Sequence, residues 1–214
     1  MVKGYVFKEK VKSWGREIWG HKYLIIISIL FLIISVVLDI IAGTYADKKA
    51  SVPVTDIILD NLPVINLSFF FSYGIILIII VGLGYTLFFK VRELHVVLSQ
   101  FSLLVLIRSF FVTLTHLRRP TEAVVNSYLS NIPRIFAFEN DLFFSGHVAI
   151  SFLGFLLFRK EKIGIFFLIM TFMMAFTVLA MHVHYSIDVF AALFITYGSY
   201  KIGQRLFKRS NHYN

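Results

Sequence analysis

Six long apolar runs determine what this chain of 214 residues can fold into. The hydrocarbon core of a bilayer is about 30 Å thick, and a helix of about 20 apolar residues crosses it. Basic or polar segments separate the runs, which lie at Tyr23–Ala42, Phe69–Phe89, Leu94–Leu114, Leu142–Phe158, Ile163–Ala180 and Ser186–Phe207. We therefore expect an all-α, polytopic membrane helix bundle with six transmembrane helices.

The composition excludes several other classes of protein. Hydrophobic residues make up 58% of the chain and charged residues 15%, which is too apolar for the surface of a soluble globule. Cysteine is absent, so disulfides, thiolate catalysis and cysteine metal sites are excluded. The net charge of +9 comes from basic residues beside the apolar runs, as membrane orientation and anionic lipid require. We expect no nucleic-acid partner.

The chain divides into a head, a membrane domain and a short tail. Residues 1–22 predict a cationic amphipathic helix in the membrane interface, since apolar residues recur among lysines and arginines at helical spacing: Phe7, Val11, Trp14 and Ile18. Residues 23–209 contain all six spans, and residues 210–214 form the tail. No loop is long enough to bury a core of its own. The sequence is compatible with a homo-oligomer.

Basic residues are distributed unequally between the two sides that six spans would define. With the head inside, the inner segments hold 15 of the 21 Lys and Arg residues and the outer segments hold 6. The positive-inside rule then places both termini in the cytoplasm. Residues 43–68 and 115–141 become extracytoplasmic loops.

Two polar stretches lie where spans meet the outer side, Asp141–His147 and His182–Asp188. Between them are two apolar runs joined by the basic turn Arg159–Lys162, so a single inner hairpin returns both stretches to the same face. Ionisable side chains at membrane depth are unfavourable and usually functional. The alternative is a purely structural polar cluster.

These residue types suit phosphoryl transfer through a phosphohistidine. His184 is the candidate nucleophile, and Asp188, four residues later, can hold its ring in the reactive tautomer. His147 can protonate the leaving alkoxide and later deprotonate the acceptor. We therefore expect an active site on the extracytoplasmic face formed by His147, His184 and Asp188.

Ser145 and Gly146 directly precede the fourth span and are candidates for phosphate binding. Ser145 can cap the helix, and the small Gly146 leaves backbone N–H groups open to an anion. The alternative for Ser145 is a cap that binds no ligand.

Arg108 is a further candidate, because it lies inside the third apolar run. It can bind phosphate or form a structural ion pair with Asp39 in the first span, and the sequence favours neither. Arg118 and Arg119 can contact phosphate or the surrounding anionic head groups.

His182 and His116 have weaker functional interpretations. A metal site around His182 lacks enough clustered ligands, so we expect no metal and no cofactor. The position of His116 suits an interfacial residue and a site residue equally.

The motifs resemble the sphingomyelin synthase family, a lipid phosphotransferase branch of the type 2 phosphatidic acid phosphatase superfamily. Asp141-Leu-Phe-Phe-Ser-Gly-His147 is similar to that family's Cys-Gly-Asp…Ser-Gly-His block. His184-Tyr-Ser-Ile-Asp188 is similar to its His-Tyr-Thr-Ile/Val-Asp block, and Arg108–Thr113 to its third-span arginine block. Asp141 and Tyr185 fall within these motifs and join the candidates for substrate binding.

The resemblance implies a glycerophospholipid donor and a ceramide or diacylglycerol acceptor, with His184 as nucleophile, Asp188 as its orienting partner and His147 as acid and base. Glu139-Asn140 replace the family's Cys-Gly, so the head group and acceptor stay open. One alternative is a lipid phosphate phosphatase or phospholipase C-like hydrolase using the same site. Another is a non-catalytic scaffold or transporter.

The topology predicts that a tag at the C-terminus and a tag at residue 125 report opposite sides of the membrane. An even number of spans returns the tail to the side of the head, whereas residue 125 falls in an outer loop. A membrane-impermeant label applied to intact and permeabilised cells measures this. Labelling of both tags from one side would contradict six spans.

Overall fold

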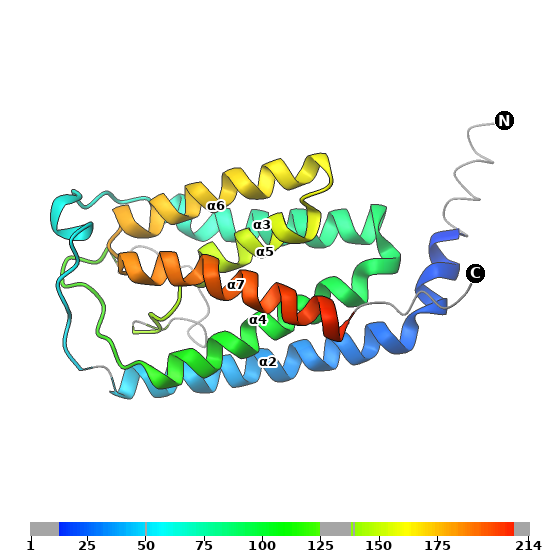
Figure 1. The fold of residues 1–214 in the computed structure, drawn as a ribbon, viewed down its shortest axis with the longest axis horizontal. Helices are drawn as coiled ribbons and strands as arrows, with labels where there is room; N and C mark the ends of the chain where they lie inside the picture. Colours follow the sequence, from blue (N-terminus) through cyan, green and yellow to red (C-terminus); the bar gives the residue numbers. More distant parts are fainter. Residues whose placement is uncertain (1–12, 50, 125–137, 139, 208–214) are drawn as a thin grey trace.

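The computed structural model describes residues 13–49, 51–124, 138 and 140–207, and within them the chain forms helices and no strand. Residues 13–20 are helical and lead through a bend into the first long helix (Figure 1). The six long helices are α2 (Lys22–Lys49), α3 (Ser68–Phe89), α4 (Leu94–Leu114), α5 (Gly146–Phe158), α6 (Lys162–Ala180) and α7 (Ser186–Leu206). Short 3-10 turns lie at Leu59–Asn61 and Val91–Glu93.

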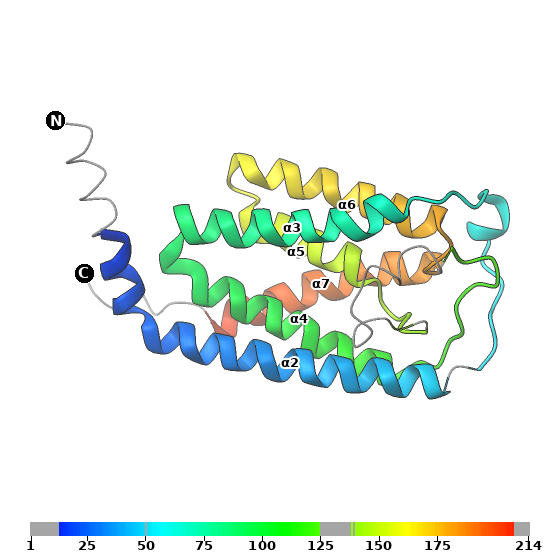
Figure 2. The same cartoon turned by 180° about the vertical axis from the view of Figure 1, so that it is seen from behind.

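The long helices lie side by side in one bundle, with α5 at its centre. α2 packs mainly on α4, whereas α5 contacts α3, α4, α6 and α7. The connections between α3 and α4 and between α5 and α6 lie at one end, which we call the hairpin end (Figures 1 and 2). The other connections lie at the opposite end, which we call the loop end. The helical bundle expected from the sequence is confirmed.

Four helical segments are long and apolar enough to cross a membrane: Lys22–Lys49, Ser68–Phe89, Val91–Leu114 and Lys162–Ala180. α5 has only 13 residues and is therefore about 20 Å long. α7 has 21 residues but a more polar sequence. The crossing of the membrane by α5 and α7 stays a prediction.

α5 begins later than the apolar run suggested, at Gly146 instead of Leu142. The reason is a long-range contact. Arg108 donates hydrogen bonds to the carbonyl oxygens of Asp141 and Phe144, at 3.2 and 3.1 Å. These bonds hold the segment before α5 in a non-helical conformation. The segment is nevertheless buried, and irregular backbone at membrane depth is stable where protein surrounds it.

α2 is longer than the predicted span, which ended at Ala42, and reaches Lys49. Small residues allow close packing in this extension, since a Cβ atom at Gly43 would lie 2.6 Å from the Phe138 ring. Ala42 and Ala46 are buried against Val112 of α4. Tertiary contacts thus extend the helix beyond its apolar core.

The described part of the head, residues 13–20, packs at the hairpin end. The Trp14 indole N–H donates a hydrogen bond to the carbonyl oxygen of Leu87, at 2.8 Å, and Glu17 forms an ion pair with Arg92. The rest of the predicted head, residues 1–12, and the tail at 210–214 lie outside the described residues.

An ion pair joins the two connections at the hairpin end. Lys90 Nζ lies 2.8 Å from Glu161 Oε1, and the Tyr85 hydroxyl donates a hydrogen bond to the same carboxylate. Partial desolvation acts to raise the pKa of Glu161, but the contacts with Lys90 and Tyr85 outweigh it and hold that pKa below its ordinary value of 4.5. The pair links the α3–α4 hairpin to the α5–α6 hairpin.

We expect Glu161→Gln to lower the free energy of unfolding by about 0.2–1 kcal/mol at pH 7, as is usual for partly exposed ion pairs. A carboxylate with a lowered pKa stabilises the fold above its unfolded pKa, and this contribution disappears as pH falls through the folded value. The difference from wild type should therefore shrink as pH falls below 4.5 and vanish once pH is below the lowered pKa of the folded state. Denaturant unfolding in detergent measures it, with Lys160→Gln as a neighbouring control. A difference that is the same at all pH values would argue against the ion pair.

Candidate active site

His184 and Asp188 form a buried pair at the loop end. The Nδ1 atom of His184 lies 3.3 Å from the Oδ2 atom of Asp188, and their side chains are 8% and 0% exposed. The two residues do not share a helix face, because His184 precedes α7, which begins at Ser186. Asp188 reaches back across the first turn instead, and the same Oδ2 atom accepts a hydrogen bond from Tyr185 N at 3.0 Å. The histidine contact is thus part of a helix cap.

The position of Asp188 favours a negative charge. It lies in the first turn of α7, where the helix dipole and unpaired backbone N–H groups stabilise anions. Its Oδ1 atom is buried and has no hydrogen-bond partner among the described residues. The carboxylate can therefore accept the Nδ1 proton of His184, which leaves the Nε2 atom of that ring unprotonated.

His147 lies at the start of α5 and is held by the first turn of α3. Its ring packs against the Phe71 ring with centroids 3.9 Å apart, and it forms a hydrogen bond with the Phe71 backbone. The ring lies within electrostatic range of His184 and Arg108. Its Nε2 atom is buried and unbonded within the described part of the chain. A proton on this nitrogen is available to a bound molecule.

A backbone hydrogen bond joins the two polar stretches directly. Ser145 N donates to the carbonyl oxygen of Asp188, at 3.2 Å, so the N-terminus of α5 lies beside the first turn of α7. The structure therefore brings His147, His184 and Asp188 together at one end of the bundle.

Ser145 and Gly146 form the start of α5. Ser145 is the N-cap residue, but its hydroxyl makes no capping bond, is fully buried and has no partner among the residues described. A Cβ atom at Gly146 would lie 3.3 Å from the Arg108 Nε atom, so glycine permits the close approach of the guanidinium. A helix N-terminus beside a guanidinium is well suited to an anion.

Arg108 forms an ion pair with Asp39, which is one of the two interpretations that the sequence left open. Its Nη1 atom lies 3.3 Å from Asp39 Oδ1 and 2.8 Å from Asp141 Oδ2. Together with the two bonds to the carbonyls of Asp141 and Phe144, the guanidinium fixes the segment that enters α5. The structure thus gives Arg108 and Asp141 a positioning role.

Tyr185 joins the loops above the site. Its hydroxyl donates to the carbonyl oxygen of Arg118 at 2.7 Å and accepts from Val54 N at 3.1 Å. Its ring packs with Leu59 and Leu142 in a small buried cluster. Tyr185 therefore joins the loop that follows α2 to the loop that follows α4.

Asp56 was missed by the sequence analysis. Its Oδ2 atom accepts from Ser186 N at 2.7 Å, at the start of α7, while Oδ1 accepts from Ile58 N at 2.9 Å. Partial burial acts to raise the pKa of Asp56, but the bonds from Ser186, Leu59 and Ile58 keep that pKa below its usual range. An aspartate before a short turn is a recognisable capping pattern, although its second partner is distant in sequence.

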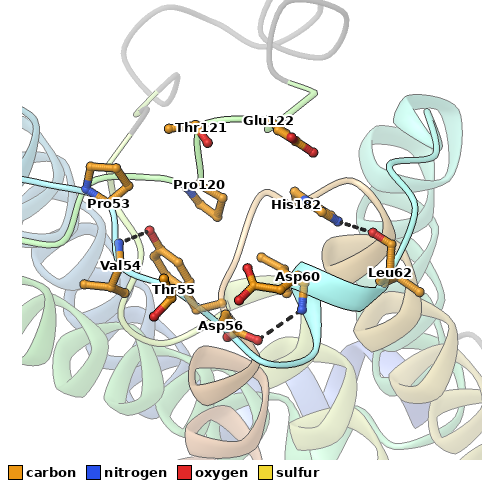
Figure 3. A pocket seen from close by; sticks show the side chains of 12 residues that line it. Pro53, Val54, Thr55, Asp56, Asp60, Leu62, Pro120, Thr121, Glu122 and His182 are labelled. Atoms are coloured by element: carbon orange, nitrogen blue, oxygen red, sulfur yellow. Dashed lines mark hydrogen bonds between the residues drawn. The ribbon is translucent and has the colours of Figure 1, made fainter.

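A pocket of ≈ 470 Å³ lies at the loop end beside Tyr185 (Figure 3). Asp56, Asp60 and Glu122 contribute carboxylates to its lining. His182, at a positive φ of 53°, directs its Nε2 atom to the carbonyl oxygen of Leu62 at 3.0 Å (Figure 3). Within the described ranges, no group of three or more His, Asp or Glu residues is arranged to hold a metal ion.

The other candidates lie nearby. The His116 ring contacts the Tyr45 ring edge-on, with centroids 5.4 Å apart. Arg118 is exposed, and Arg119 N donates to the Asn140 side chain at 3.2 Å. Glu139, one of the family differences, lies outside the described residues.

Residues 140–204 match the family model of the PAP2 superfamily C-terminal domain. The matched range contains Ser145, His147, His184 and Asp188, but not Arg108 or Asp39. Searches of curated proteins and of solved structures give no significant match. Members of this superfamily act on phosphate esters, and the partial match agrees with an enzyme of the phosphatase or phosphotransferase type. The sphingomyelin synthase branch stays a prediction.

We expect Arg108→Gln to lower the free energy of unfolding by about 1–3 kcal/mol, since it leaves two partly buried carboxylates without their cation. Asp39→Asn should have a smaller effect, because Arg108 keeps its bond to Asp141. Denaturant unfolding in detergent measures both variants. Arg159→Gln, at an exposed site, is the control and should stay within about 0.5 kcal/mol of wild type. An Arg108→Gln protein as stable as this control would rule out the positioning role.

Proposed function

We propose that this protein is a membrane lipid phosphotransferase that moves a phospho-head group from a glycerophospholipid to ceramide or diacylglycerol. The observation that carries the proposal is the buried pair of His184 and Asp188, at 3.3 Å, beside a His147 whose Nε2 atom has no partner in the described part of the chain. Such a set of groups is suited to a covalent phosphohistidine.

In the first step, the Nε2 lone pair of His184 attacks the phosphorus of the donor lipid. The bond between phosphorus and the diacylglycerol oxygen breaks, and protonated His147 gives its proton to that oxygen. The head group remains on His184 through a new N–P bond. Asp188 stabilises the positive charge that develops on the His184 ring.

In the second step, the acceptor hydroxyl transfers its proton to His147 and its oxygen attacks phosphorus. The N–P bond breaks, so His184 is restored and His147 is again protonated. The net reaction exchanges one phosphodiester for another and consumes no cofactor or metal.

The start of α5 binds the phosphate in this mechanism. The Ser145 hydroxyl and the backbone N–H groups from Gly146 onward donate to its oxygens. Arg108 lies next to Gly146 and adds positive charge, while Asp39 and Asp141 hold it in place. Tyr185 positions the loops that cover the reacting groups.

An apolar groove beside the site supports a lipid substrate. The groove, of ≈ 420 Å³, lies between α4 and α7 and includes Phe110, Phe111 and Ile195 in its lining. The Phe111 ring also contacts the Phe143 ring of the segment before α5, with centroids 5.8 Å apart. An acyl chain in this groove would approach the site from within the membrane. In our proposal the site faces the extracytoplasmic side and both termini are cytoplasmic.

The test is head-group transfer by the purified protein. Glycerophospholipids labelled in the head group are incubated with and without ceramide or diacylglycerol, and the products are separated. We expect label in a new lipid only when acceptor is present, and phosphohistidine after acid-free quenching. His184→Ala should abolish both, and His147→Ala should lower the rate about 10²–10⁴-fold.

Asp188→Asn distinguishes the effect of Asp188 on the His184 ring from its effect on folding. Asparagine can still cap a helix, but it lacks the negative charge. We expect a loss of about 10²-fold or more in rate with near-normal stability. His182→Asn is the matched control in the same loop, since asparagine tolerates a positive φ, and it should retain most of the activity. Label released only as a water-soluble phosphate ester would show a hydrolase instead. Full activity of His184→Ala would exclude the proposed mechanism.

A further inference from the structure

A second polar pocket, of ≈ 660 Å³, lies at the hairpin end, far along the bundle from the candidate active site. It is formed by the start of α4, the end of α5 and the last turns of α7. Its polar lining residues are Arg92, Glu93, His95, Gln100, Tyr200, Lys201, Gln204 and Arg205. The proposed transfer reaction uses none of them.

The rim of this pocket is positively charged. Arg92, Lys201 and Arg205 face a single acidic residue of the lining, Glu93. Arg92 is already paired with Glu17, whereas Lys201 and Arg205 have no ion-pair partner in the described part of the chain. Both are exposed. Lys201 Nζ lies over the Tyr197 ring, 5.5 Å from its centroid, and this contact leaves the charges of both cations available to an anion.

The floor of the pocket contains an unsatisfied polar group. Gln100 is only 1% exposed and donates from Nε2 to the carbonyl oxygen of Tyr200 at 3.3 Å. Its Oε1 atom is buried and has no hydrogen-bond partner among the residues that the structure describes. Buried acceptors without a donor are unfavourable, so a ligand that brings a hydroxyl group would stabilise this one.

We propose that this pocket binds the phosphate of an anionic glycerophospholipid, with Lys201 and Arg205 on the phosphate and Gln100 accepting from a head-group hydroxyl. Basic pockets between transmembrane helices commonly bind anionic head groups. A phosphate at the rim can satisfy both cations while the lipid chains remain in the bilayer. The site is separate from the phosphotransferase site and does not depend on it.

Two double variants test the proposal. Lys201→Gln with Arg205→Gln removes the cations of the rim, and Arg159→Gln with Lys160→Gln removes two exposed cations of the same end that do not line the pocket. The full chain in detergent is titrated with phosphatidylglycerol, phosphatidylcholine, glycerol 1-phosphate or inorganic phosphate. Native mass spectrometry counts bound lipid, and thermal unfolding reports stabilisation.

We expect phosphatidylglycerol to bind at least tenfold more tightly than phosphatidylcholine. The rim variant should weaken its binding at least tenfold, and the control variant less than twofold. Gln100→Leu should weaken it as well, because the head-group hydroxyl loses its acceptor. Equal weakening by both double variants would overturn the proposal in favour of diffuse surface attraction. Stabilisation by inorganic phosphate that phosphatidylglycerol cannot displace would overturn the lipid as the source of the phosphate.

Discussion

The bundle depends on how it compensates one buried cation. A guanidinium among membrane helices is unfavourable unless charge and hydrogen bonds surround it. Arg108 of α4 meets Asp39 of α2, the carboxylate of Asp141 and two carbonyl oxygens of the segment before α5. Because these partners come from α2 and from the segment before α5, the same contacts that neutralise the charge also hold the residues that lead to His147.

The Asp188 carboxylate links chemistry to folding at the loop end. One oxygen accepts from Tyr185 N and contacts His184, so the carboxylate that we propose as the orienting group also caps α7. Asp56 binds the N–H of Ser186 in the same first turn from the loop before α3. A backbone N–H group thus holds the Asp188 carboxylate in place. The carboxylate contacts His184 before any substrate binds.

The sequence predicted the parts of the structure that depend on local pattern. The apolar runs gave five of the helices to within a few residues at their starts, and the hairpin argument placed His147 near His184 and Asp188. Long-range contacts decided the rest. Leu142 is not helical because of Arg108, α2 continues past Ala42 because Gly43 meets Phe138, and Asp56 bonds a residue 130 positions away. No local pattern in a single sequence contains these pairings.

The shortness of α5 has a consequence for how a head group reaches the site. A helix of 13 residues covers about 20 Å of a hydrocarbon layer about 30 Å thick, so its N-terminus lies about 10 Å below the interface if its other end is at the opposite one. Arg108, six residues before the end of α4, would lie at a similar depth of about 9 Å if that end of α4 is at the interface. In the proposed reaction, a phospholipid would have to lower its phosphate into the bilayer and lose bound water as it descends. This descent would select among head groups, because the free energy needed to remove water is largest for strongly hydrated ones.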